Sequence, residues 1–161
     1  MIVVANAGPL IALARIGQLG LLRALYGRLH IPQAVWREVV ELGQGKIGAS
    51  EVGLADWIKV VPVQDKMAVR ILRGRLDPGE SQSIVLALEI GADLLLMDEA
   101  RGRRVAEMQG LHITGTIGTL LVAKRRGMLT EVTSLLDELQ VAGFRMSRAL
   151  YRAACTLAGE L

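Results

Sequence analysis

Short apolar runs that alternate with longer stretches of helical spacing constrain the fold of this chain most strongly. The runs that predict strands are IVV at 2–4, LHI at 29–31, WIKVVPV at 57–63, DLLLM at 93–97 and HI at 112–113. Strands that are separated by helices form βαβ units, in which neighbouring strands run parallel. We therefore predict an α/β protein with three layers, α/β/α, around a central, mostly parallel sheet.

Between and after these runs, apolar residues recur at the spacing of one helix face. The stretches that predict helices are 10–25, 33–42, 50–56, 65–73, 77–90, 100–109, 114–127, 130–141 and 146–158. Gly17 and Gly20 lower the helix propensity of the first stretch. Pro32 opens the second one, at a position where its missing N–H costs nothing.

The length and composition favour one domain over residues 1–161, with a large core and no disordered tract. The single cysteine, Cys155, excludes an internal disulfide framework. Two scattered histidines, His30 and His112, cannot form a zinc site without cysteine partners. The net charge of +3 permits a polyanionic partner without requiring one.

The apolar N-terminus MIVVANAGPLIALA does not have the features of a signal peptide. No Lys or Arg precedes it, and Gly8-Pro9 interrupts the run. No stretch reaches the roughly 18 apolar residues that a membrane span needs. We therefore expect a soluble, cytoplasmic protein that does not bind membranes.

Several polar residues are expected beyond the carboxyl ends of the strands, which is where open parallel sheets bind ligands. They follow a predicted strand or lie in the next helix, and they are Asn6, Glu38, Glu80, Asp98, Glu99, Thr114 and Thr116. Together they would put carboxylates, an amide and hydroxyl groups on one rim of the sheet.

Each of these positions also has a structural explanation. Asp77 and Glu80 have the spacing of a capping box. Asp98 is in place to be the N-cap of the next helix, Glu38 is in place to be a solvated helix charge, and Asn6 is in place to be a turn residue. A functional interpretation requires that the side chains act together.

The shared chemistry of these side chains would be oxygen ligation of Mg²⁺ or Mn²⁺. Hard cations take carboxylates and waters, and such a centre can activate a water for attack on a phosphodiester. The groups that rival chemistries need are missing from the sequence, which has no GxSxG elbow, no CxxC and no Cys–His pair near a strand end.

Two further patterns have open alternatives. TGTIGT at 114–119 could hold a phosphate through backbone N–H groups, or it could serve close packing of helix on sheet. The arginines of RGRR at 101–104 and the basic run KRR at 124–126 could bind a nucleic-acid backbone, or they could complement helix dipoles.

Six segments in this order and spacing resemble the PIN domain family, and most closely its VapC-like subgroup. They are VVANAGPLIALARIG, IPQAVWREV, LDPGESQSIVLALE, LLLMDEARGRRVAEMQG, TGTIGTLLVAKRRG and GFRMS, and they span about residues 1–151. The resemblance implies a ribonuclease that depends on Mg²⁺ or Mn²⁺. It also implies a toxin that is paired with a small antitoxin protein and is often a homodimer.

The motifs assign candidate roles residue by residue. The catalytic candidates are Asn6, Glu38, Glu80 and Asp98; the metal candidates are Glu38, Glu80, Asp98 and Glu99; the substrate candidates are Thr114, Thr116, Arg101 and Arg104. One position departs from the family, which usually has Asp where this chain has Asn6. An amide carbonyl can still ligate a metal ion, but the site loses a full negative charge.

The sequence leaves three functional hypotheses. The first is a metal-dependent endoribonuclease acting as a toxin. The second is a catalytically weakened relative that binds RNA or an antitoxin, which is favoured by Asn6 and opposed by the three retained acids. The third is an assembly domain whose apolar helices form a dimer face.

Overall fold

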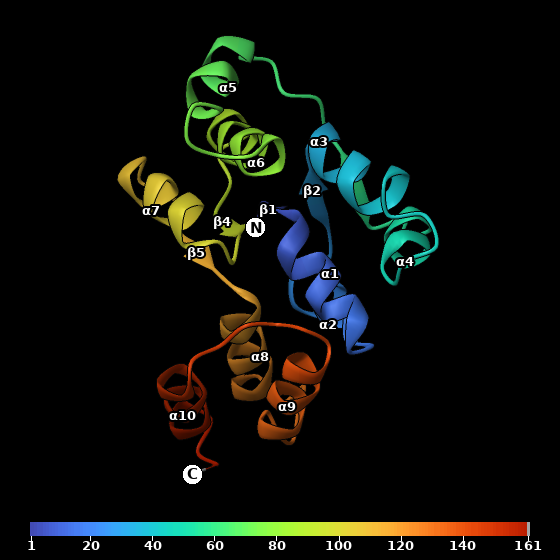
Figure 1. The fold of residues 1–161 in the computed structure, drawn as a ribbon, viewed down its shortest axis with the longest axis vertical. Helices are drawn as coiled ribbons and strands as arrows, with labels where there is room; N and C mark the ends of the chain where they lie inside the picture. Colours follow the sequence, from blue (N-terminus) through green and yellow to red (C-terminus); the bar gives the residue numbers. More distant parts are fainter. Residues whose placement is uncertain (161) are drawn as a thin grey trace.

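The computed structural model describes residues 1–160, and within them five strands form one sheet in the order β3-β2-β1-β4-β5. The strands are β1 (Val3–Ala5), β2 (Leu29–Ile31), β3 (Ile58–Val60), β4 (Leu94–Leu96) and β5 (Ile113–Thr114). Every neighbouring pair is parallel. Helices cover both faces of this sheet (Figure 1), which confirms the predicted three-layer α/β/α architecture.

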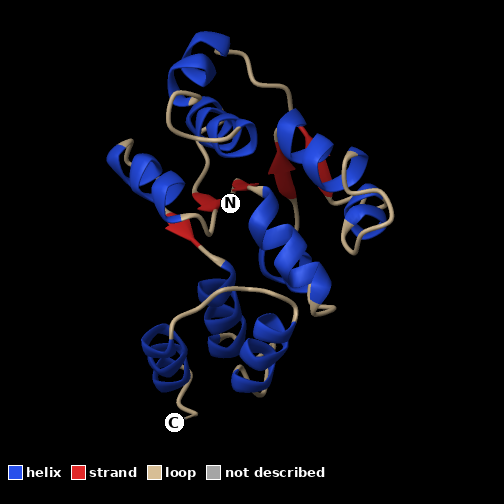
Figure 2. Ribbon diagram, viewed as in Figure 1, coloured by secondary structure: helices blue, strands red, loops and turns tan. Residues whose placement is uncertain are grey.

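Helices connect the strands and continue after the last one (Figure 2). Before β4 they are α1 (Ala7–Arg15), α2 (Gly20–Tyr26), α3 (Gln33–Trp36), the π-helix η1 (Arg37–Glu41), α4 (Ala49–Gly53), α5 (Lys66–Leu72) and α6 (Pro78–Glu89). After β4 they are α7 (Ala100–Met108), α8 (Thr116–Arg125), α9 (Thr133–Val141) and α10 (Arg148–Leu157).

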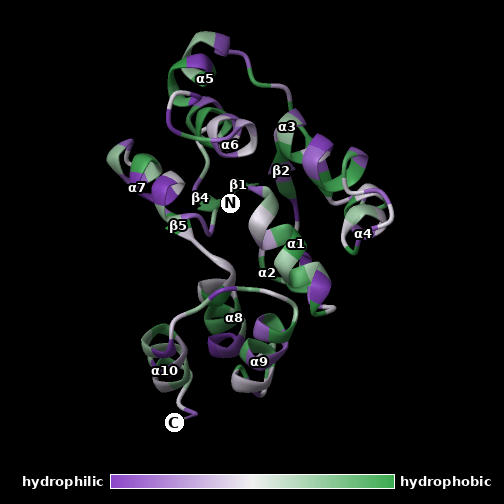
Figure 3. Cartoon of the chain, viewed as in Figure 1, coloured by the Kyte–Doolittle hydropathy of each residue, from purple (hydrophilic) through white to green (hydrophobic). Residues whose placement is uncertain are grey.

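The side chains of β1 alternate between two cores. Val3 and Ala5 belong to a cluster that α1, α2 and α8 complete, whereas Val4 belongs to a second cluster on the opposite face, under α6 and α7. Because successive strand residues point to opposite faces, a strand covered on both sides has to be apolar throughout. The exposed helices α5 and α7 instead mix hydrophilic and hydrophobic residues (Figure 3).

The expected single helix over residues 10–25 is wrong. The structure has two helices there, α1 and α2, because the chain turns at Gly17, whose φ is +68°. A left-handed φ of this kind is inexpensive only for glycine. The turn is closed by the Gln18 N–H, which donates to the carbonyl oxygen of Leu13 at 2.8 Å.

The strand expected over residues 57–63 is shorter than predicted and covers only Ile58–Val60. Val61 still donates its N–H to the carbonyl oxygen of Ile31 at 2.9 Å. Pro62 follows and has no N–H to continue the ladder.

Within residues 1–160, the structure contains no helix with the length and apolar character needed to cross a membrane.

Candidate functional site

The order of the strands reverses at β1, which pairs with β2 on one side and with β4 on the other. This is the topological switch point, where parallel sheets open a crevice at the carboxyl ends of their strands. Asn6 follows β1 directly, and its backbone N–H donates to the carbonyl oxygen of Leu96 in β4 at 2.9 Å. Asp98 comes two residues after that carbonyl, so the switch point places Asn6 and Asp98 side by side.

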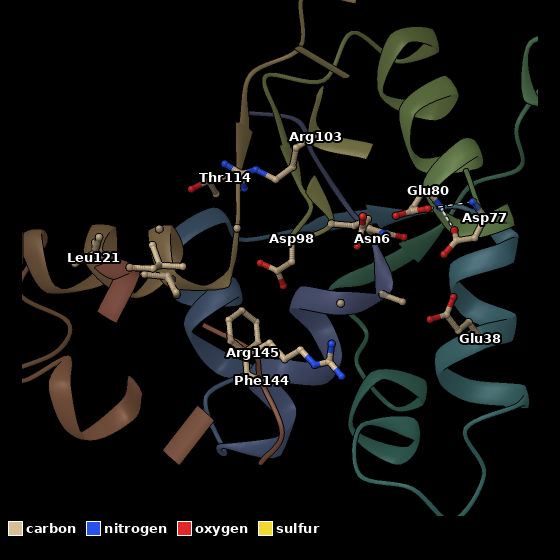
Figure 4. Close-up of a pocket in the computed structure, with 17 residues that line it drawn as sticks. Asn6, Glu38, Asp77, Glu80, Asp98, Arg103, Thr114, Leu121, Phe144 and Arg145 are labelled. Carbon is tan, nitrogen blue, oxygen red and sulfur yellow. Dashed lines mark hydrogen bonds between the residues drawn. The ribbon is translucent and has the colours of Figure 1, made fainter. Parts of the chain in front are cut away.

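A cavity of about 770 Å³ opens at this edge of the sheet. Its polar lining includes Asn6, Glu38, Asp77, Glu80, Asp98 and Glu99. Figure 4 shows Asn6, Glu38, Asp77, Glu80 and Asp98 coming from several parts of the chain. Asp98 lies between Asn6 on one side and Thr114 and Arg103 on the other. The acids and the amide that the sequence singled out therefore all line one cavity.

Asp98 is held in place by the first turn of α8. Its Oδ1 accepts a hydrogen bond from the backbone N–H of Thr116 at 2.7 Å, and its Oδ2 accepts one from the Thr116 hydroxyl at 2.7 Å. Burial raises the pKa of the Asp98 carboxyl, although the Thr116 hydrogen bonds and the charge of Arg103 oppose the rise. The hydrogen bonds thus fix the orientation of the carboxylate, while its burial disfavours the charged form.

Glu80 caps the start of α6 and also lines the cavity. Its Oε1 accepts the Asp77 N–H at 3.0 Å, while Asp77 Oδ1 accepts the Glu80 N–H at 2.7 Å, so the predicted capping box is confirmed. Glu80 is buried, with 6% of its surface exposed. Burial raises the pKa of its carboxyl, the Asp77 backbone hydrogen bond opposes this, and the charges of Asp77 and Glu99 add to the rise.

Glu38 reaches the cavity from the first turn of the π-helix η1. A π turn changes the direction of side chains relative to an α-helix and is common at functional sites. The turn depends on Gly43, because a Cβ atom there would collide with the carbonyl oxygen of Val39. Partial burial in the cavity raises the pKa of Glu38, and the nearby charge of Asp77 raises it further.

Asn6 is buried at the base of the cavity, with 7% of its surface exposed. It occupies the N-cap position of α1 without a side-chain capping bond, and its Oδ1 accepts a long hydrogen bond of 3.5 Å from the Ser83 hydroxyl. The alternative that Asn6 only caps or closes a turn is therefore not supported by its side-chain contacts.

Oxygen atoms from three elements surround Gly79. A Cβ atom at this residue would lie 3.1 Å from Asn6 Oδ1, 3.4 Å from Glu38 Oε1 and 3.6 Å from Asp77 Oδ1. A residue with a side chain would therefore fill the space onto which these oxygens converge. Gly79 keeps that space open.

Glu99, and not Asp98, is the N-cap of α7, and its Oε1 accepts the Arg101 N–H at 3.3 Å. Asp98 is thereby left to face the cavity. Glu99 also lines the cavity, so its assignment as a metal ligand stays a prediction.

The substrate candidates do not all meet at this cavity. Thr114 lines it, but Thr116 is fully buried behind Asp98. Arg101 and Arg104 face a separate groove, and Arg103 takes the place beside the acids, where it donates to the carbonyl oxygen of Met97 at 2.9 Å. The structure places Arg101 and Arg104 outside the acidic cavity, and their assignment as substrate-binding residues stays a prediction.

In this structure, the TGTIGT segment positions Asp98 and allows close packing of α8. The Thr116 N–H is used by Asp98 and is not free for a phosphate. A Cβ atom at Gly115 would lie 2.6 Å from Asp98 Oδ1, and one at Gly118 would collide with the Thr114 hydroxyl. Both glycines permit close approach of α8 to Asp98 after β4 and to Thr114 at the end of β5.

Sequence reasoning missed Phe144 and Arg145, which lie between α9 and α10 and line the cavity opposite the acids (Figure 4). Their segment, GFRMS, contributed to the family resemblance, but no chemistry was assigned to it. A basic and an aromatic residue beside each other were the signal that was available. They give the cavity one wall suited to a phosphate and a base.

The donor set fits a hard divalent cation in its chemistry. It consists of carboxylate and amide oxygens, which Mg²⁺ and Mn²⁺ prefer, and includes neither thiol nor imidazole. Within residues 1–160, however, no three Asp, Glu, His or Cys side chains are close enough together to form a ready cluster of metal ligands. Because Mg²⁺ keeps several waters and takes one or two carboxylates directly, the arrangement is compatible with such an ion.

A family model described as a PIN domain matches residues 2–160 of the chain. The chain belongs to the PIN domain family. PIN domains are generally nucleases and typically use divalent metal ions, so a nuclease-type hydrolase is the activity that family membership supports. None of the curated proteins matches the chain. The match includes α9 and α10, so the PIN domain extends slightly beyond the segments that carried the resemblance.

Proposed function

We propose that this PIN domain is an Mg²⁺- or Mn²⁺-dependent endoribonuclease of the VapC-like subgroup, and that it is the toxin of a toxin–antitoxin pair in the cytoplasm. The observation that carries the proposal is the convergence of Glu38, Glu80 and Asp98 on one cavity at the switch point of the sheet. Burial raises the pKa of all three carboxyls. A bound cation would favour their charged forms.

Each group in the cavity has a distinct role in this proposal. Glu38, Glu80 and Asp98 would hold the ion, and Asn6 would offer a neutral carbonyl oxygen. When bound, the ion supplies Lewis-acid polarisation of the phosphate and a water of lowered pKa. Thr116 keeps Asp98 oriented, while Arg103 and Arg145 at the cavity wall would balance the charge of the phosphodiester.

The partners in this proposal are an RNA substrate, a small antitoxin protein and a second copy of the chain. The mildly basic net charge of +3 is compatible with RNA. The antitoxin and the homodimer rest on the resemblance to the VapC-like subgroup.

Cleavage of a mixed RNA pool by the purified chain in Mn²⁺, Mg²⁺ or EDTA tests the proposal. We expect cutting in either metal and none in EDTA. We expect no cutting by Asp98→Asn, which keeps the shape of the side chain but removes its charge. Asp56→Asn is the matched control, because Asp56 is exposed and outside the cavity. Cleavage that survives in Asp98→Asn would overturn the proposal.

Metal binding can be followed without activity. Mn²⁺ should raise the thermal midpoint of the wild-type chain and of Asp56→Asn, because a ligand that binds only the folded state stabilises it. The increase should be smaller in Asp98→Asn. An equal increase in all three proteins would place the ion elsewhere.

A second candidate function is RNA or antitoxin binding without cleavage, and Asn6 is the observation that favours it. The residue is buried at the base of the cavity and contributes no charge. Asn6→Asp separates the two functions. If only Asn6→Asp cuts RNA, and Asp98→Asn abolishes that gain, the natural chain is a binding protein.

A further inference from the structure

A second hollow, of about 300 Å³, lies between α7 and the loop that joins α5 to α6. We call it the arginine groove, and its lining residues are Gly74, Arg75, Arg101, Arg104, Val105 and Met108. Its charged residues are all arginines, and its remaining surface is largely apolar. Met108 is 76% exposed, so the apolar part of the groove is open to solvent.

The arginines of the groove form no ion pair in the described part of the chain. Within residues 1–160 the ion pairs are Arg37–Glu41 and Lys124–Glu160, and neither includes a residue of the groove. Arg101 donates to the backbone carbonyl oxygen of Arg75 at 3.4 Å, which brings two guanidinium-bearing residues together. Like charges held close to one another favour an anionic partner.

Both walls of the arginine groove continue into the acidic cavity. Asp77 comes two residues after Arg75, and Glu99 comes two residues before Arg101, and both acids line the cavity. Two residues span at most about 7 Å of chain. An RNA strand that left the cavity between the starts of α6 and α7 would meet the groove next.

Positive charge next to the acidic cavity would favour the binding of RNA there. Its carboxylates repel the phosphates on either side of the bond to be cut, and a metal ion offsets this repulsion only locally. Guanidinium groups just outside the cavity would add to the attraction that Arg103 and Arg145 offer at the cavity wall. The exposed Met108 offers an apolar surface for a sugar or a base.

We propose that the arginine groove binds phosphates of the RNA strand next to the bond held in the acidic cavity. The position of the scissile bond in this statement rests on the proposed function. The binding of a single-stranded polyanion to Arg75 and Arg104 does not. The occupant is RNA, and an acidic protein segment is the alternative that the test excludes.

The test is fluorescence anisotropy with a labelled single-stranded RNA of 12 nucleotides in EDTA, over a range of salt concentrations. Wild type is compared with Arg75→Gln/Arg104→Gln. The control is Arg23→Gln/Arg152→Gln, which removes the same charge from exposed residues outside both hollows. Circular dichroism and thermal unfolding verify that both variants fold.

We expect the groove variant to bind RNA at least about 10-fold more weakly than wild type at low salt. We expect its plot of log K against log salt to be shallower by about 1.4, which is about 0.7 for each lost phosphate contact to a single strand. The control should stay close to wild type. An equal loss of RNA affinity in both variants would mean that only net charge matters, and it would overturn the proposal. No loss of affinity in either variant would also overturn it.

Two additional arms separate the alternatives. A poly-glutamate peptide of the same length should not displace the RNA, and tighter binding of the peptide than of RNA would overturn the proposal in favour of a protein partner. In Mn²⁺, the groove variant should cut the 12-nucleotide RNA more slowly than wild type does. It should cut a dinucleotide at the wild-type rate. If wild type cuts nothing, the proposed function fails, while the anisotropy result still decides whether the groove binds RNA.

Discussion

Thr116 donates two hydrogen bonds to Asp98, one from its backbone N–H and one from its hydroxyl, each 2.7 Å long. The two residues are 18 positions apart, and each is placed by the end of a different parallel strand. Thr116 is fully buried and Asp98 faces the cavity, so Thr116 acts through Asp98. The orientation of Asp98 in the cavity therefore depends on Thr116, which does not line the cavity itself.

Thr116→Val tests this relationship. The substitution keeps the size of the side chain and the backbone N–H bond but removes the hydroxyl that fixes Asp98 Oδ2. Partners of this kind typically contribute 10- to 100-fold to metal affinity or activity. We expect a loss of about that size in RNA cleavage and in Mn²⁺ affinity, measured by titration. Thr116→Ser should recover most of both, and equal behaviour of Val and Ser would contradict the role of the hydroxyl.

Gly115→Ala tests the close packing around Asp98 from the other side. The added Cβ atom would lie 2.6 Å from Asp98 Oδ1 and 3.0 Å from Arg103 Nη1, so the carboxylate has to move. We expect cleavage to fall by more than about 10-fold because misplaced reacting groups are costly. Gly20→Ala is the matched control, since nothing lies within 4 Å of a Cβ atom there. Gly115→Ala with wild-type activity would show that Asp98 tolerates displacement.

Glu80 has a capping role and a proposed catalytic role, and two substitutions separate them. Glu80→Gln should keep the bond to the Asp77 N–H, because Gln also forms capping boxes. We expect it to retain the free energy of unfolding but to lose metal-dependent cleavage. Glu80→Ala should lose both, with a destabilisation of about 1 kcal/mol. Chemical denaturation and an RNA cleavage assay measure the two effects, and active Glu80→Gln would limit Glu80 to capping.

The sequence allowed prediction of the sheet and of the acids at its rim for a physical reason. Strands buried on both faces are apolar throughout, so a polar residue after such a run marks the carboxyl end of a strand. Asn6 and Asp98 were found in this way. Glu80 was a candidate because it lies in the first turn of a buried helix, and the capping box that its spacing from Asp77 also predicted holds it there.

Other features depend on tertiary packing and could not be predicted in this way. Arg101 and Arg104 are three residues apart on α7 and share one face, whereas Arg103 points elsewhere. The sequence shows this separation, but only packing on the sheet decides which face meets the cavity. The π turn at Glu38 is likewise followed by a position, Gly43, where a Cβ atom would collide with the carbonyl oxygen of Val39, and helical periodicity does not reveal this.

The carboxylate of Glu160 accepts backbone N–H groups at the start of α9. Oε2 accepts hydrogen bonds from Lys124 Nζ at 2.6 Å and from the Val132 N–H at 2.7 Å, and Oε1 accepts the Thr133 N–H at 2.8 Å. Burial opposes the charge, but the hydrogen bonds from Lys124, Thr133 and Val132 outweigh it and lower the pKa of Glu160 to about 2. The charged form is therefore tied to the folded state.

The sign of the pH dependence follows from this depressed pKa. The stabilisation is fully present above the ordinary glutamate pKa of 4.5, and it is lost as the pH falls from there through about 2. Glu160→Gln should lower the thermal midpoint at pH 7, and the difference from wild type should shrink when the same pair is compared at pH 3 and then at pH 2. Glu131→Gln is the control, because Glu131 is exposed and directly precedes Val132. A difference that stays constant over this range would mean that Glu160 acts through its shape and not through its charge.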